Sequence, residues 1–160
     1  MAADMFLKLE GVPGESQDDK HKGEIEIDSF SWGATQESTL GRGTGGGAGK
    51  VNFDSLNFTK KMDKASPILM LHCASGKHIP SATLTARKAG EQQLEYLKIK
   101  MTDVMVSRVH FNANGGGGIP SENLSLSFAK VETEYTPQSQ KGTGEGAVKF
   151  GWDLSKNVKV

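Results

Sequence analysis

The segment whose residue types most directly suggest chemistry is a glycine-rich run, Gly41-Arg42-Gly43-Thr44-Gly45-Gly46-Gly47-Ala48-Gly49-Lys50. Gly41, Gly43 and Gly46 satisfy the G-x-G-x-x-G pattern, whose glycines let backbone N–H groups approach a pyrophosphate at a helix N-terminus. Residues 51–58, VNFDSLNF, are instead rich in β-formers and show no helical spacing. Because the site would lack its helix, we interpret the run as a loop between two strands.

A second phosphate-binding pattern, G-x-x-x-x-G-K-[ST], also fails at this run. The residue five positions before Gly49 is Thr44, and Val51 follows Lys50 where the pattern needs a hydroxyl for magnesium. A nucleotide-dependent enzyme therefore has little support in the sequence.

The four histidines, which are the next candidates for catalysis or metal binding, form no H-x-H or H-x-x-x-H pair. His72 is interpreted as a packed side chain, and His21 and His78 as surface residues beside turns. No metal site or cofactor is expected.

The cluster at residues 18–21, DDKH, could be an acid/base group or a turn-stabilising group before Glu24. Acid/base catalysis needs environments that separate two pKa values, which a solvated loop does not supply. No G-x-S-x-G nucleophile elbow occurs in residues 14–18, GESQD. The sequence therefore predicts no catalytic residues and a protein that is not an enzyme.

Composition and charge narrow the range of partners and of cellular location. The 160 residues are enough for one domain, 1–160, and carry 19 basic and 19 acidic residues. Because the formal net charge is zero, the chain has no overall attraction for a polyanion, and neither nucleic acid nor a membrane is an expected partner. The single cysteine, Cys73, excludes an internal disulfide. The N-terminus shows no signal peptide, so we expect cytoplasmic synthesis and export only by a machinery that reads no cleavable signal.

Strand-like segments dominate the chain, and three of them change the parity of their apolar residues. A flat strand cannot place both sets on one face. In the first of the three we therefore expect a bulge near Asp28-Ser29, or else a strand that leaves the core and presents its other face to a neighbouring subunit. Three switches together indicate strongly coiled strands that close into a small barrel. The switching sets are Ile25 and Ile27 to Phe30 and Trp32, Val51 and Phe53 to Leu56 and Phe58, and Leu97, Ile99 and Met101 to Val104 and Val106.

One helix is expected between these strands. Ser66 is predicted to cap it, Pro67 to stand in its first turn and Gly76 to end it. Apolar spacing predicts a stripe that packs on the barrel, formed by Ala65, Ile68, Leu69 and His72. The predicted fold class is mainly β: an antiparallel β-barrel or sandwich with one covering α-helix.

Several longer motifs occur along the chain. They are residues 14–25 (GESQDDKHKGEI), 29–33 (SFSWG), 64–67 (KASP), 73–80 (CASGKHIP), 84–85 (LT), 87–90 (RKAG) and 95–97 (EYL). These motifs are long and specific, and they resemble a known family, the haemolysin-coregulated proteins (Hcp) of bacterial type VI secretion. The likeness extends over nearly the whole chain.

The resemblance implies a small two-sheet β-barrel similar to phage tail-tube proteins, assembled as a hexameric ring with a wide channel. Such rings stack into the inner tube that contractile sheath proteins drive, behind a VgrG-type spike protein, into a target cell. Members of the family also hold small effector proteins inside the ring, as receptor and chaperone. No catalytic residues come with the resemblance.

In such a ring, a polar strand face would line the channel. Glu26, Ser29 and Ser31 are the predicted lumen-facing residues, because they oppose the apolar positions on either side of the expected bulge. The extended Gly-rich loop, Gly41 to Lys50, is predicted to dock on the next ring or the adjoining subunit, since glycines let it conform to a surface. Two rival hypotheses remain: a stand-alone ligand-binding β-barrel, and the nucleotide-dependent enzyme.

Overall fold

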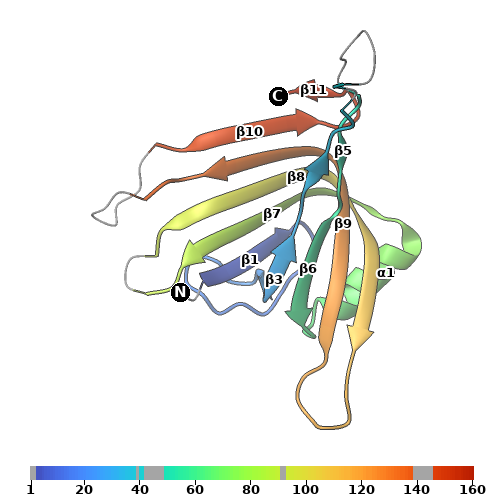
Figure 1. Cartoon of the computed structure of the whole chain (residues 1–160). Helices are drawn as coiled ribbons and strands as arrows, with labels where there is room; N and C mark the ends of the chain where they lie inside the picture. Colours follow the sequence, from blue (N-terminus) through green and yellow to red (C-terminus); the bar gives the residue numbers. More distant parts are fainter. Residues whose placement is uncertain (1–2, 39, 42–48, 91–92, 139–145) are drawn as a thin grey trace.

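The computed structural model describes residues 3–38, 40–41, 49–90, 93–138 and 146–160, and within them the chain is mainly β (Figure 1). Its elements, in chain order, are β1 (Ala3–Leu9), β2 (Ile25–Ile27), β3 (Ser29–Ser31), β4 (Ala34–Thr35), β5 (Asn52–Phe53), β6 (Leu56–Lys61), α1 (Ser66–Ser75), β7 (His78–Lys88), β8 (Glu95–Asn112), β9 (Ser121–Tyr135), β10 (Val148–Asp153) and β11 (Val158–Lys159).

The strand pairings run round a closed circuit, as in a barrel. Antiparallel pairs join β1 to β7, β7 to β8, β8 to β9, β9 to β6 and β6 to β3, while β2 pairs with the free side of β1. Only Asp28 separates β2 from β3, so this segment completes the circuit. The second half of β9 pairs instead with β10, which extends the sheet beyond the barrel. The predicted fold class is confirmed.

The first parity switch marks the point where the chain changes neighbours. Ile25 and Ile27 are buried while β2 pairs with β1. The Asp28 N–H then donates to the Thr59 carbonyl at 2.8 Å, and Phe30 packs against the same core from β3. The parity change therefore falls at Asp28, where the chain moves from pairing with β1 to pairing with β6 and the apolar side chains stay inward. The predicted bulge is not found there, since neither pairing shows a register shift.

The switch within β8 coincides with a sharp bend that Figure 1 shows in both β8 and β9. Asp103 has a φ of 53°, in the left-handed region, and Met101 and Val104 on its two sides are both fully buried. On β7, Ile79 and Ala82 are likewise both buried across Pro80-Ser81. β7 and β8 therefore change the alternation of buried and exposed side chains at paired positions. As a result, the same side of the sheet faces the core before and after the bend.

The helix ends as predicted but begins differently. Gly76 has a φ of 67°, and its N–H donates to the His72 carbonyl at 2.9 Å. The prediction of Ser66 as the cap is wrong, because Ala65 holds that position without a side-chain cap bond. The Ala65 N–H instead donates to Asp63 Oδ1 at 3.0 Å. The Ser66 hydroxyl oxygen accepts a hydrogen bond from the Asp63 N–H, also at 3.0 Å.

A buried ion pair ties the start of the helix to the barrel. Lys60 on β6 and Glu122 on β9 face each other in register, both side chains are 0% exposed, and their Nζ and Oε2 atoms lie 2.5 Å apart. Lys60 Nζ also donates to Asp63 Oδ1 at 2.7 Å and to Ser66 Oγ at 3.1 Å. The ammonium thus has partners on two strands and on the helix turn, which is what a charge removed from water requires.

Arg87, near the C-terminal end of β7, holds the segment between β1 and β2 through an ion pair with Asp18. The Asp18 carboxylate accepts bonds from the Arg87 guanidinium, at 2.9 Å for Nη1, and from the backbone N–H groups of Lys20 and His21. The interpretation of residues 18–21 as a turn-stabilising cluster is confirmed. The Arg87 bond, opposed by burial, holds the pKa of Asp18 below its ordinary value.

The interpretation of His21 as a surface residue is wrong. Its side chain is buried and stacks on Phe6 with ring centroids 4.4 Å apart. Nδ1 lies 2.7 Å from Glu24 Oε2, and Nε2 lies 2.7 Å from Glu95 Oε1. Glu95 is 74 residues away in the chain, so no local pattern could have indicated this contact.

We expect Lys60→Met to lower the free energy of unfolding by about 3–5 kcal/mol, because it leaves the Glu122 carboxylate buried without its counter-charge. Urea denaturation measures the loss. Lys61→Met, at the exposed neighbouring position, is the control, with an expected change within about 0.5 kcal/mol. Lys60→Met combined with Glu122→Leu should recover most of the stability. A loss below about 1 kcal/mol for the single variant would contradict the assignment.

We expect the stability difference between the wild type and Asp18→Asn to be pH-dependent. Because the pKa of Asp18 is lowered from 3.8 on folding, its contribution is fully present above that value and is lost as the pH falls through the folded-state pKa. Denaturation at a series of pH values from neutral to acid measures the difference. Asp19→Asn, an exposed neighbour, is the control; a difference that stays constant down to the lowest pH would refute the prediction.

Candidate functional site

The three residues predicted to line a lumen are all exposed, and the structure brings two of them together. Ser29 and Ser31 lie on β3, where Ser29 Oγ is 2.6 Å from Thr59 Oγ1 and Ser31 pairs with Asn57. Glu26 lies apart on β2, beside a different hollow that it shares with Asp28 and with residues 61–63.

Ser29 and Ser31 belong to a shallow polar groove of about 370 Å³ that crosses β3, β6, β9 and β8. Ser125 Oγ donates to Asn57 Oδ1 at 2.5 Å. The residues between the polar ones, such as Phe58 and Leu124, are buried in the core. The polar side chains that line the groove, here named the polar groove, are those of Ser29, Ser31, Asn57, Thr59, Arg108, Asn123 and Ser125.

Five members of the polar groove were missed by sequence reasoning. Residues 56–59 (LNFT) and 123–127 (NLSLS) do alternate polar and apolar positions, which is the signal for a strand with one solvated face. Nothing in the sequence pairs those two segments with β3. Arg108 could not be placed, because the register of β8 against β9 shifts between Val106 and Arg108.

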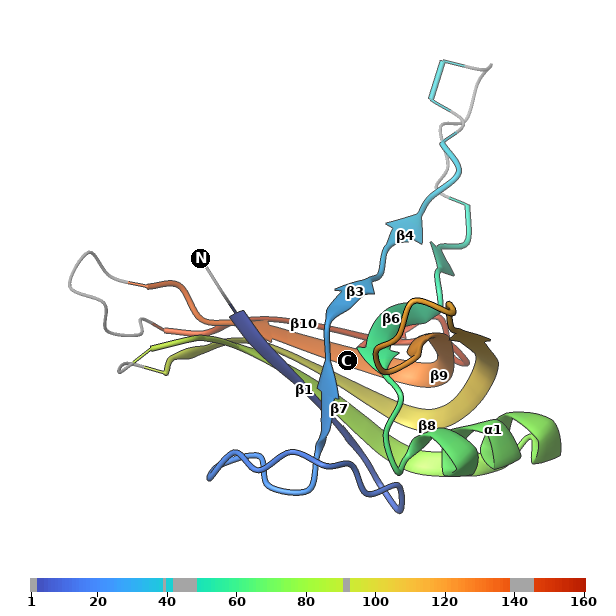
Figure 2. The same ribbon diagram turned by 90° about the horizontal axis from the view of Figure 1, so that it is seen from below.

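The Gly-rich loop is only partly within the described residues, since positions 42–48 lie outside them. Gly41 has a φ of 86°, and Gly49 and Lys50 are exposed. The Gly49 N–H donates to the Glu37 carbonyl at 3.4 Å. In Figure 2, β4 and the described residues 36–38 and 40–41 project away from the barrel. The described residues that flank the Gly-rich loop therefore lie away from the core.

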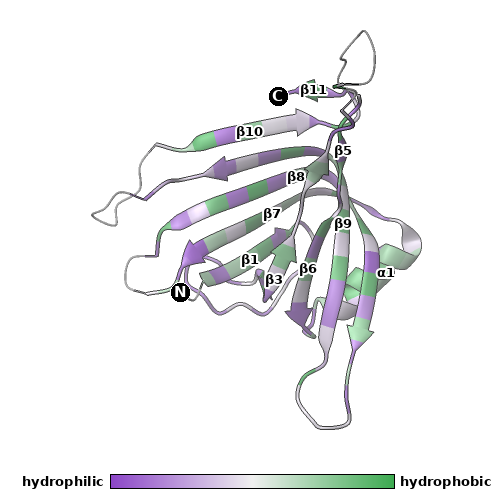
Figure 3. Ribbon diagram, viewed as in Figure 1, coloured by the Kyte–Doolittle hydropathy of each residue, from purple (hydrophilic) through white to green (hydrophobic). Residues whose placement is uncertain are grey.

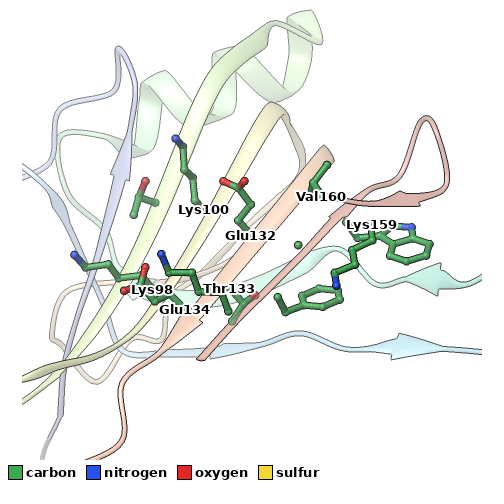
Figure 4. Close-up of a pocket in the computed structure, with 12 residues that line it drawn as sticks. Lys98, Lys100, Glu132, Thr133, Glu134, Lys159 and Val160 are labelled. Atoms are coloured by element: carbon green, nitrogen blue, oxygen red, sulfur yellow. The ribbon is translucent and has the colours of Figure 1, made fainter. Parts of the chain in front are cut away.

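A second hollow, of about 630 Å³, lies over β8, β9, β10 and the C-terminal residues, as Figure 4 shows. Its charges alternate across the strands in register: Lys98 pairs with Glu134, which pairs with Lys149, and Lys100 pairs with Glu132. Opposite charges on facing strand positions stabilise the sheet. The arrangement is that of a mixed-charge face.

The other side of this part of the sheet is apolar and partly uncovered. Figure 3 shows hydrophobic and hydrophilic bands alternating along β7 to β10. By register Leu97, Tyr135 and Val148 share one side, and Tyr135, Val148 and Phe150 are 49%, 65% and 44% exposed. The core side of the sheet therefore continues past the barrel into solvent.

The described residues offer no sign of a metal or a membrane helix. No group of three or more His, Cys, Asp or Glu side chains among them could hold a metal ion. The only helix described, α1, is too short to cross a bilayer.

Comparison with known proteins shows which family this chain belongs to. A family model for the type VI secretion system effector Hcp matches residues 6–135. The chain therefore belongs to the Hcp family of type VI secretion proteins, and the resemblance seen in the sequence is confirmed.

Individual relatives are similar over their whole length. The Protein hcp1 of Pseudomonas aeruginosa is 48% identical over 162 aligned residues, covering all of both chains. The crystal structure of Hcp1 from Salmonella typhimurium is 40% identical with a TM-score of 0.80, again over both whole chains. A solved structure of a type six secretion system protein is 37% identical with a TM-score of 0.94, covering 99% of this chain and 100% of the other.

Proposed function

We propose that this chain is the structural subunit of a type VI inner tube, in which six copies form a ring and rings stack. The observation that carries the proposal is the two-sided sheet of an Hcp-family chain. One part of its surface is apolar and uncovered, and another is a polar groove. The first suits a contact between copies, and the second suits a channel wall.

The contact between copies is argued from Tyr135, Val148 and Phe150. These side chains extend the core side of the sheet into solvent, where exposed apolar area is costly. A neighbouring copy that covered them would bury that area. Because the same patch meets a different surface on the neighbour, the contact repeats around a closed cyclic ring.

The channel wall is argued from the polar groove. Ser29 and Ser31 in the polar groove, together with Glu26 outside it on β2, would face the lumen, where small effector proteins are held and chaperoned. Hydroxyl and amide groups hydrogen-bond a passing protein without the tight, dry contact that apolar side chains make. In this arrangement the polar groove retains cargo reversibly.

The Gly-rich loop, Gly41 to Lys50, would dock on the next ring or the adjoining subunit. Its described flanks project from the barrel, as a stacking contact requires (Figure 2). The remaining partners would be the VgrG-type spike and the contractile sheath proteins, with the chain made in the cytoplasm and expelled by the type VI machinery.

Shortening residues 42–48 should leave the native mass of the ring unchanged and lower the amount of protein secreted. Wild-type secretion by that variant would count against the docking role of the Gly-rich loop.

We expect the wild type to give a native mass of about 103 kDa, six times the 17.1 kDa of the chain, and a six-fold ring by electron microscopy. Phe150→Lys should shift the mass toward 17.1 kDa, because it places a charge in the buried contact. Leu71→Lys, at an exposed position on α1, is the control and should keep the ring. A monodisperse wild-type monomer at micromolar concentration would instead favour a stand-alone β-barrel.

We expect Ser31→Glu to lower the amount of a cognate effector that co-purifies per ring by about tenfold or more, since a bulky anion fills the polar groove. Native mass should remain that of the ring. Ser155→Glu, at an exposed position outside the polar groove, is the control. Unchanged effector retention in Ser31→Glu would show that this face does not line the lumen.

A further inference from the structure

The strands that carry the polar groove are almost free of acidic residues, although the whole chain has as many acidic as basic ones. Across β3, β6, the first half of β9 (121–127) and the second half of β8 (104–112), the only carboxylate is Glu122. Its side chain is 0% exposed and paired with Lys60. The outward side of these segments therefore carries no negative charge.

Arg108 places a permanent positive charge in the polar groove. It is exposed, and among the described residues no carboxylate lies within ion-pair distance of it. The register shift leaves Ser107 as an extra residue, so that Ser107 and Arg108 are both exposed beside Ser125. A bulge of this kind re-aims a side chain, and here it turns Arg108 outward while Val106 stays buried.

The neighbours of Arg108 add hydrogen-bond donors to this charge. The Asn57 and Asn123 amides and the Ser29, Ser31 and Thr59 hydroxyls line the same groove. Guanidinium, amide and hydroxyl donors together match the acceptor oxygens of a carboxylate. Lys61, the outward cation of β6, lies instead beside the hollow that holds Glu26 and Asp28.

We propose that the polar groove binds an acidic segment of a protein cargo, with a carboxylate of that segment on Arg108. This inference rests on the proposed tube function, because it names the kind of effector surface that the channel wall selects. A basic segment meets like charge at Arg108. A nucleic acid is the poorer match, since binding along a phosphate backbone draws on several cations and the groove supplies one.

The experiment compares two peptides of equal length, acetyl-(Glu-Ser)4-amide and acetyl-(Gln-Ser)4-amide, by isothermal titration calorimetry against the full chain at low salt. The glutamate peptide should bind about three- to tenfold tighter, and added salt should reduce the difference, as for a partly exposed ion pair. Arg108→Gln should abolish the preference, Arg108→Lys should keep part of it, and Lys156→Gln, at an exposed site outside the groove, should leave it intact.

Three results would overturn the inference: no binding of the glutamate peptide, equal binding of both peptides, or an unchanged preference in Arg108→Gln. Native mass is recorded for every variant in the same samples. A wild-type mass of 17.1 kDa would refute the tube function, whereas a ring without the glutamate preference would refute only the assignment of acidic cargo. The two failures are therefore distinguishable.

Discussion

The barrel depends on one geometric constraint, which is that long strands must bend sharply without turning their apolar side outward. In a regular strand the side chains alternate, so a bend that preserves alternation would carry Val104 to the opposite face from Met101. Asp103 has a left-handed backbone conformation, which interrupts this alternation, so that Met101 and Val104 are both buried. Pro80 on β7 lies at the same level, where the parity of that strand also changes. The continuous core follows from these irregularities.

The same constraint accounts for the buried ion pair. The odd-numbered residues of β6 point outward, so Leu56, Phe58 and Lys60 point inward. The Lys60 ammonium therefore needs a partner inside the barrel. Glu122, directly opposite on β9, supplies it, and its removal from the surface is also what leaves the outer side of these strands without negative charge. One inward pair thus shapes both the core and the polar groove.

The sheet therefore carries two surfaces of different chemistry, which suit two kinds of contact. Beyond the barrel, the core side is exposed at Val148 and Phe150 and favours association with another copy. On the barrel itself, the outer side is polar and can form hydrogen bonds to a second molecule. In the proposed tube, the first surface would hold the neighbouring copies firmly and the second would release its cargo.

Local patterns in the sequence determined the strand-rich fold class, the parity switches, the C-terminal end of the helix at Gly76 and the family to which the chain belongs. They also placed Ser29 and Ser31 on an exposed face, since alternation is a property of neighbouring residues. Only the tertiary structure decided that Asn57, Ser125 and Arg108 join those serines, and that His21 lies between Glu24 and Glu95. These contacts depend on register between strands far apart in the sequence, and a shift of one residue, as at Arg108, reverses the face on which every later side chain lies.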